Sequence, residues 1–317
     1  MSTVPTTVLS EADGADTDTG RLVDASRGRL LAVVVAIVLY TEVLPLQVAM
    51  VGAGVQKITK SFPTVGANIS WTIIIVALVG ASLTPLLGKM ADIWGKRRIF
   101  VLCGVVFVVG AVICALTSSW TLFLVGRGLS AAAIATQVIA YGLLRDLLPR
   151  KYVALGLGAS ATGLGFSAIM GPIIGGYLVD NYDWRALFWF LAIFTIVMIP
   201  VVLLVVPESK LRVKDRLDLV GAALLAAGIA LVLIYLDKGQ EWGWGRPTTL
   251  AWVIGGVVLL GLFFVVEFRT RRPIMNMRLL LSPTMGAVLL FGFLGPASCN
   301  CRHIRSVTWS RSRPPGN

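Results

Sequence analysis

The sequence predicts an all-α membrane protein, and three observations support this fold class. Of the 317 residues, 56% are hydrophobic and only 14% are charged, and the mean hydropathy is +0.84. A soluble globular domain is nearer half apolar and a quarter charged, so it could not bury this much apolar surface. The apolar residues also form continuous runs that do not alternate with polar residues, unlike the strands of a membrane barrel. Helices are the remaining spanning form, because they satisfy their own backbone hydrogen bonds in lipid.

Successive apolar runs each come close to the ~20 residues that a helix needs to cross the hydrocarbon core. They cover residues 30–51, 71–87, 99–116, 122–144, 154–178, 186–206, 219–236 and 249–266. A further run, residues 283–296, is shorter than a usual span and ends at a Gly-Pro pair.

The order of these runs divides the chain into segments. Residues 1–29 are polar and lack the apolar core of a signal peptide, so we expect a disordered cytoplasmic tail. Six spans follow in residues 30–206, and the charged segment 207–218 forms a cytoplasmic linker. Two additional spans occupy residues 219–268, and residues 279–296 begin a ninth helix.

Residues 297–317 differ abruptly in composition from the rest of the chain and form a basic tail. One hypothesis is that this tail is not native and results from translation in a wrong reading frame after a deletion. The alternative is a genuine short basic terminus, since unusual termini are common. Cys299, Cys301 and His303 lie here, but their spacing fits no common zinc pattern, so we expect no metal site.

The formal net charge of +12 follows the loops and forms no separate basic stripe, so the sequence does not predict a nucleic-acid partner. The loops on the side of the N-terminus hold most of the Lys and Arg residues. They are Arg21, Arg27, Arg29, Lys89, Lys96, Arg97, Arg98, Arg145, Arg150, Lys151, Lys210, Arg212, Lys214, Arg216, Arg269, Arg271, Arg272 and Arg278. The opposite loops hold only Lys57, Lys60, Arg185, Lys238 and Arg246. This bias predicts that the N-terminus lies in the cytoplasm and that the lipid bilayer is the main partner of the chain.

Glu42 lies near the middle of the first span, where an ionisable side chain is costly and usually functional. Burial favours the protonated form of a carboxyl group, which suits a group that takes up and releases protons. Pro45 leaves the carbonyl of Thr41 without its helical partner and predicts a kink beside the carboxyl group. The alternative is a static ion pair with a neighbouring helix.

Arg127 is a second charge within an apolar run, and it needs an anion, water or carbonyl groups as partners. Its small neighbours favour burial, in which case it could act with the Glu42 carboxyl in proton transfer. The alternative is that the side chain extends to the outer surface, because Arg127 lies in the outer third of its span.

The turn between the second and third spans combines glycine, a carboxylate and a basic cluster. Gly88 and Asp92 share one face if the second span stays helical to its end, and Gly95 allows a tight reversal. Lys96, Arg97 and Arg98 follow where a new helix begins. The sequence therefore predicts a short cytoplasmic latch.

The fifth span carries small residues at helical spacing, Ser167, Gly171 and Gly175, together with Pro172 and Gly176. Such a stripe allows another helix to approach closely, and Pro172 adds a kink. The alternative is ordinary helix packing without a role in transport. The sequence contains no phosphate-binding glycine loop, no Ser/His/Asp set and no metal cluster, so we do not expect an enzyme.

These motifs occur in the order found in the drug:proton antiporters of the major facilitator superfamily, and the chain resembles in particular their branch with fourteen membrane helices. The resemblance covers about residues 30 to 296 and rests on the 88–98 turn, on Arg127, on the Gly171-Pro172-x-x-Gly175-Gly176 motif and on the Pro207-Glu-Ser linker. The chain departs from the family at Ser130 and Ala131, where Gln and Gly are usual, and at Ser167, where glycine is usual.

The resemblance implies an exporter of amphipathic small molecules in the plasma membrane, driven by a proton gradient and without a cofactor. It also implies that Asp92 caps a helix of the second half, and it makes Asp146 a partner for Lys96 or Arg97. Because most of a second half is missing from the sequence, we expect transport to be impaired in this chain. The alternatives are a membrane remnant that does not transport and a symporter that takes up a nutrient with protons.

Overall fold

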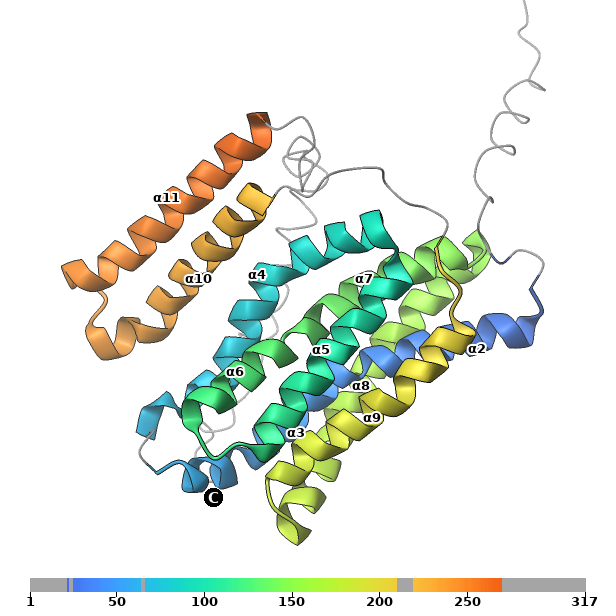
Figure 1. Cartoon of the computed structure of the whole chain (residues 1–317), viewed down its shortest axis with the longest axis horizontal. Coiled ribbons are helices and arrows are strands. Elements are labelled where there is room, and N and C mark those ends of the chain that lie inside the picture. The colour runs from blue at the N-terminus through green and yellow to red at the C-terminus, as the bar shows by residue number, and fades with distance from the viewer. Residues whose placement is uncertain (1–21, 23–24, 64–65, 210–218, 270–317) are drawn as a thin grey trace, which may run out of the picture.

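A computed structural model describes residues 22, 25–63, 66–209 and 219–269, and within these residues the fold is entirely helical (Figure 1). The helices are α2 (Arg27–Thr41), α3 (Val43–Ser61), α4 (Trp71–Trp94), α5 (Lys96–Leu116), α6 (Trp120–Ser130), α7 (Ala132–Leu147), α8 (Arg150–Asn181), α9 (Arg185–Val205), α10 (Leu219–Trp242) and α11 (Pro247–Arg269), with the short 3-10 helix η1 (Gly66–Ser70) before α4. The predicted all-α fold is confirmed.

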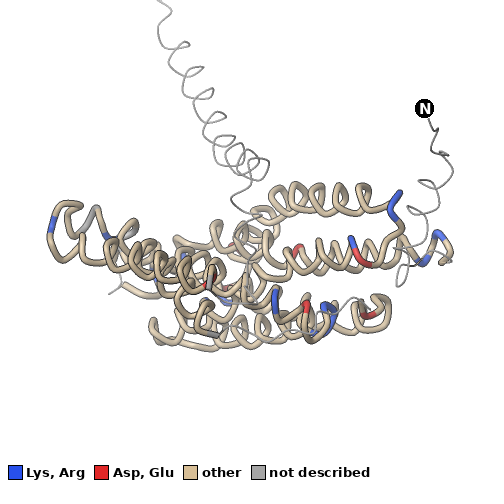
Figure 2. Tube along the Cα trace, turned by 90° about the horizontal axis from the view of Figure 1, so that it is seen from above, with Lys and Arg blue, Asp and Glu red and all other residues tan. Residues whose placement is uncertain are grey.

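Seven helical stretches of the described chain are long and apolar enough to cross a membrane. Two of them consist of a pair of consecutive helices, α2 with α3 and α6 with α7, joined at a single residue. The expected span at residues 219–236 corresponds to α10, whose apolar part, Val220–Leu236, is shorter than these seven stretches. Charged positions gather toward the ends of the helices and leave long uncharged lengths between them (Figure 2).

Helix ends follow local chemistry more closely than they follow hydropathy. Helix α2 begins at Arg27, three residues before the apolar run, because the Ser26 hydroxyl accepts a hydrogen bond from the Arg29 amide at 3.4 Å. Helix α4 continues past its apolar run to Trp94. It ends there because Gly95 has φ +111°, a conformation that other residues rarely adopt.

Six spans form a bundle in which α5 packs against α6, α7 and α9 (Figure 1). Helices α5 and α6 approach each other closely at Gly110 and Gly126. A Cβ atom on Gly110 would lie 2.6 Å from the Gly126 carbonyl oxygen and 2.8 Å from the Ser130 amide nitrogen. The two backbones can approach this closely only because neither glycine carries a side chain.

The remaining helices, α10 and α11, form a hairpin that packs against α4 on the side of the bundle (Figure 1). The Ser82 hydroxyl of α4 donates to the Ala226 carbonyl of α10 at 3.3 Å, and Lys238 donates to the Asn68 side chain at 2.9 Å. These contacts attach the hairpin near the middle of α4 and beside its N-terminus.

Several chain ends meet at one end of the bundle, which we name the Gly95 end. The turn at Gly95, the C-terminus of α7 and the segment that follows α9 lie here, as the contact between Lys96 and Asp146 and that between Arg97 and Glu208 demonstrate. The N-terminus of α2 is attached to the same end, because the Leu22 amide donates to the Leu147 carbonyl at 2.9 Å. The segments that meet at the Gly95 end belong to the loops that are rich in Lys and Arg in the sequence.

Some expectations concern residues outside the described part of the chain. They are most of the tail 1–29, residues 210–218 of the linker, the start of a ninth helix at 279–296, and the basic tail 297–317 with Cys299, Cys301 and His303.

The contact between α5 and α6 predicts that Gly110→Ala destabilises the fold by about 1–3 kcal/mol, because the added methyl group meets backbone atoms that cannot rotate away. Thermal unfolding in detergent should show the loss as a lower Tm. Gly52→Ala is the matched control, since a Cβ atom there has no neighbour within 4 Å. Equal Tm values for the two variants would contradict this account of the packing.

Candidate functional site

Glu42 occupies the junction between α2 and α3, where the first span breaks. Its amide still donates to the carbonyls of Val38 and Leu39, at 3.2 and 3.3 Å, so the chain turns without losing this hydrogen bond. Pro45 follows within the first turn of α3, where its missing amide hydrogen costs little. The predicted irregularity beside the carboxyl group is present. The side chain itself is only 5% exposed.

The Glu42 carboxyl group is seated against α8. The Ser167 hydroxyl donates a short hydrogen bond to Glu42 Oε2, and Ser167 is 1% exposed. A Cβ atom on Gly163 would overlap Glu42 Oε1, so glycine at this position leaves the space that the carboxyl group occupies. Glu42 Oε1 is buried and has no hydrogen-bond partner among the described residues. Oε2 therefore accepts a hydrogen bond from α8, whereas Oε1 accepts none from the described residues and is able to bind a proton.

Arg127 is buried in the bundle at 1% exposure, so its side chain does not extend to the outer surface. Its Nε atom donates to the Thr72 carbonyl oxygen at 2.8 Å, and its Nη1 atom donates to Gln47 Oε1 at 3.3 Å. The Phe188 ring lies 5.8 Å from the guanidinium carbon. A carbonyl, an amide and an aromatic face thus stabilise the charge, as a guanidinium in an apolar setting requires.

The described residues show no contact between Arg127 and the Glu42 carboxyl, so a joint role in proton transfer stays a prediction. Within the described residues no cation pairs with Glu42, so the alternative of a static ion pair is also not observed. Gln47, which binds Arg127, lies five residues after Glu42, about 7 Å farther along the helix. Gln47 also donates to the Ser130 carbonyl at 3.4 Å, so both the oxygen and the nitrogen of its side-chain amide are hydrogen-bonded.

At the Gly95 end, Lys96 makes the contact with Asp146 that the resemblance implied. Lys96 Nζ lies 2.6 Å from Asp146 Oδ2 and 3.3 Å from Asp92 Oδ1. The Lys96 and Asp146 side chains are only 15% and 10% exposed, so solvent screens this pair weakly. The Ser209 hydroxyl also donates to Asp146 at 2.8 Å. The latch thereby connects the ends of α4, α5 and α7 with the segment after α9.

Glu208 is a second acidic partner in this network. Its Oε1 atom accepts from the Arg97 amide at 3.0 Å, and its Oε2 atom lies 3.8 Å from Arg98 Nε. A Cβ atom on Gly95 would lie 2.8 Å from Glu208 Oε1. Glycine at this position therefore allows the positive φ of the turn and also leaves room for the Glu208 carboxylate. A carboxylate at the N-terminus of α5 also complements the helix dipole. Arg97 Nη1 donates to the carbonyls of Leu203 and Val206 and holds the end of α9.

The structure places Gly88 and Asp92 on α4 without the neighbours that their motif suggests. A Cβ atom on Gly88 would meet nothing within 4 Å, so close helix approach at Gly88 is absent within the described residues. Asp92 is 45% exposed and its partner is Lys96. Any helix that Asp92 caps lies outside the described chain.

The small-residue stripe of α8 packs against α3. A Cβ atom on Gly171 would overlap Ala49 Cβ, and a Cβ atom on Gly175 would lie 3.0 Å from Met50 Cα. Gly176 faces open space, so it does not take part in this contact. Helix α8 is continuous through Pro172 and is not divided there.

Gln47, Glu208 and Gly163 contact these charged groups, but their sequence motifs do not predict the contacts. Gln47 is a fully buried amide in an apolar run, and that pattern alone marks it as a partner for a buried charge. Glu208 was assigned only to the linker, and no pattern in the sequence connects it with Arg97. Among the described residues no cluster of three or more His, Cys, Asp or Glu side chains could hold a metal ion.

Comparisons with known proteins agree on one family. The model of the Major Facilitator Superfamily matches residues 31–300. An uncharacterized MFS-type transporter of Mycobacterium tuberculosis is 29% identical over 84% of this chain and 40% of its own length. A probable actinorhodin transporter of Streptomyces coelicolor is 31% identical over 64% of this chain and 36% of its own length. The multidrug transporter protein MdtP of Bacillus subtilis is 24% identical over 77% and 45%. The chain thus spans less than half the length of these relatives.

A solved structure gives the same assignment for the fold. A bacterial homologue of the human lysosomal transporter Spinster, in an inward-facing and unoccupied conformation, superimposes with a TM-score of 0.52. The two share 18% sequence identity over 78% of this chain and 64% of the other. Because the family model covers most of the sequence, the chain belongs to the Major Facilitator Superfamily.

Proposed function

We propose that this chain takes part in the proton-coupled export of amphipathic small molecules, as an antiporter of the plasma membrane with its N-terminus in the cytoplasm. The observation that carries the proposal is the buried Glu42 carboxyl group at the break between α2 and α3, seated on Ser167. Relatives named as a multidrug transporter and a probable actinorhodin transporter support export, and the sequence motifs support the branch with fourteen membrane helices.

The seat of Glu42 suits a group that exchanges protons with transport. A carboxylate buried without a cation is costly, and protonation removes that cost. Ser167 and Gly163 both belong to α8, so a change in the charge of Glu42 alters how the first span packs against the fifth. Proton uptake at this residue is therefore able to bias the bundle between two arrangements, as alternating access requires.

The network at the Gly95 end is the second component of the proposal. Lys96, Asp146 and Glu208 join helix ends that would have to separate if this end of the bundle opened. We assign the network the role of a latch on the cytoplasmic side, in which the Lys96–Asp146 pair contributes most because it is the least exposed.

Glu42→Gln should abolish proton-driven transport, because the amide occupies the same seat but cannot exchange a proton. The 317-residue chain is reconstituted in liposomes with an acid interior, and the uptake of ethidium and of pyrenebutyrate is followed by fluorescence. Exchange of internal protons for external dye should be lowered at least about tenfold by the substitution.

Asp180→Asn is the matched control for this assay, because it makes the same kind of chemical change at a side chain that is 78% exposed. Its rate should equal that of the unchanged protein. Dye uptake that requires an acid exterior in place of the acid interior would indicate a symporter. Equal gradient-driven rates in the Glu42→Gln variant and in the Asp180→Asn control would contradict the proposed role of Glu42.

Asp146→Asn should loosen the Gly95 end by about 2–3 kcal/mol, because Lys96 loses its least exposed partner. Hydrogen exchange read by mass spectrometry should become faster at residues 96–100, 143–148 and 203–209. Asp183→Asn, which removes the partner of Arg185 in the turn between α8 and α9, is the control and should leave these segments unchanged. Unaltered exchange in Asp146→Asn would exclude a latch at this pair.

A further inference from the structure

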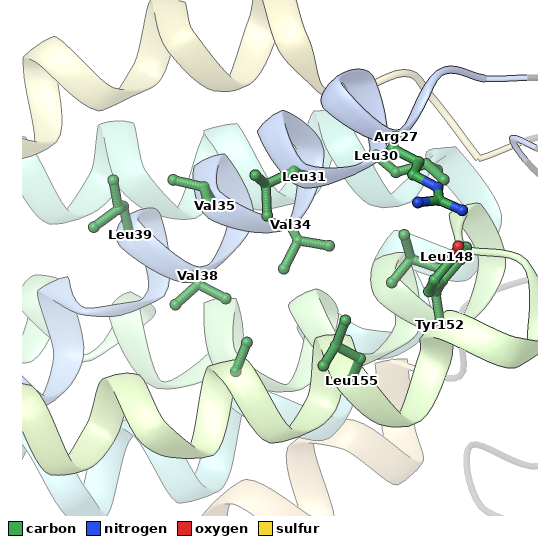
Figure 3. Close-up of a pocket in the computed structure, with 11 residues that line it drawn as sticks. Arg27, Leu30, Leu31, Val34, Val35, Val38, Leu39, Leu148, Tyr152 and Leu155 are labelled. Atoms are coloured by element: carbon green, nitrogen blue, oxygen red, sulfur yellow. The ribbon is translucent and has the colours of Figure 1, made fainter.

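A groove runs between α2 and α8, on the same two helices that hold the Glu42 seat (Figure 3). Its volume is about 470 Å³. Sites for drug-sized ligands occupy roughly 300–1,000 Å³, so the groove is large enough for one small amphipathic molecule.

The walls of the groove are aliphatic along most of its length. Val34 and Val38 of α2 face Leu155 of α8 across it (Figure 3), and Ala159 of α8 also lines the groove. Leu31, Val35 and Leu39 extend the apolar surface of α2 and are all exposed, so no protein covers them in the described chain. Burying them under an apolar ligand would contribute roughly 25 cal/mol for each Å² that is covered.

One end of the groove is positively charged. Arg27 is the charged side chain among the residues that line it, and the Tyr152 hydroxyl points toward the Arg27 guanidinium (Figure 3). Arg27 is exposed, and it makes no hydrogen bond or ion pair with the described residues. The exposed cations Arg29 and Lys151 lie next to this end in the sequence, and among the described residues no carboxylate lines the groove. An anionic group is the chemical complement of this end.

The other end of the groove approaches Glu42. Val38 lies one helical turn before Glu42, and Ala159 lies one turn before Gly163. Val38 also packs beside Gly163, within 3.1 Å of the position that a Cβ atom would take there. A molecule that fills the groove therefore presses on the side chains that surround the carboxyl group, which connects its binding with the state of Glu42.

We infer that this groove binds the transported molecule and that the molecule is an amphipathic organic anion. Its apolar body lies between α2 and α8, and its carboxylate, sulfonate or phosphate group binds Arg27 and the Tyr152 hydroxyl. The inference rests on the proposed function, because it names the substrate class of that exporter. The continuity of the groove with the Glu42 seat favours a transported molecule over a membrane lipid that only covers the surface.

The test uses two probes that share an apolar body and differ in charge, the anion pyrenebutyrate and the neutral pyrenebutanol. The 317-residue chain is placed in nanodiscs of zwitterionic lipid, and saturable binding is measured after subtraction of empty nanodiscs. Pyrenebutyrate should bind more tightly than pyrenebutanol. Arg27→Gln should weaken pyrenebutyrate binding about tenfold and leave pyrenebutanol unchanged, because the variant removes only the charged contact.

Matched variants separate the groove from the rest of the surface. Arg29→Gln removes an exposed cation that does not line the groove and should change neither probe. Ala159→Trp fills the groove and should remove the binding of both probes, whereas Ala161→Trp, at an exposed position of α8 outside the groove, should remove neither. Should Ala159→Trp fail to fold, Arg27→Gln still decides the result, because Arg27 is exposed.

Three outcomes would overturn the inference. Equal effects of Arg27→Gln on the two probes would show that the site has no preference for an anion. Unchanged binding in a folded Ala159→Trp variant would place the probes elsewhere. Loss of pyrenebutyrate binding when the nanodiscs that hold the chain also contain phosphatidylglycerol would assign the groove to a membrane lipid. Binding needs no proton gradient, so failure of transport alone would count only against the proposed function.

Discussion

The buried carboxyl group of Glu42 is the constraint on which the arrangement of the bundle depends. A polar group in the hydrocarbon region must find its partners inside the protein, because lipid offers none. The fifth span meets this demand with glycine at position 163 and a hydroxyl at position 167, one turn apart on the same face of α8. The contact fixes how α2 and α3 lie against α8, and the stripe at Gly171 and Gly175 continues it along α3.

The same demand explains the other charged positions of the bundle. The Arg127 guanidinium is satisfied by a backbone carbonyl and by the Gln47 amide, so the bundle holds its cation and its carboxyl group at separate places. At the Gly95 end, where helices finish, Lys96 and Arg97 join four chain segments through the carboxylates of Asp92, Asp146 and Glu208. Each ionisable side chain inside the bundle is thus stabilised by its own neighbouring groups, whereas the charged side chains at the Gly95 end form a network.

Sequence reasoning succeeded where the physics is local to one helix or one turn. Hydropathy located the spans, Pro45 indicated the irregularity beside Glu42, and Gly95 indicated the reversal between α4 and α5. It failed where the answer depends on which helices are neighbours. Periodicity gives the faces of a helix but not the element that each face meets, so the contact between Arg127 and Gln47 could not be predicted. Glu208 was missed for the same reason, because its contact with Arg97 spans 111 residues.

The most direct test of the account is an infrared titration of the purified chain in lipid. A protonated carboxyl group in an apolar setting has a resolved C=O absorption, so difference spectra between acid and alkaline samples report its proton exchange. We predict one such band that disappears in Glu42→Gln and changes frequency in Ser167→Ala, because the serine hydroxyl is its hydrogen-bond donor. Identical difference spectra for the unchanged chain and Glu42→Gln would contradict the claim that this carboxyl group takes up and releases a proton.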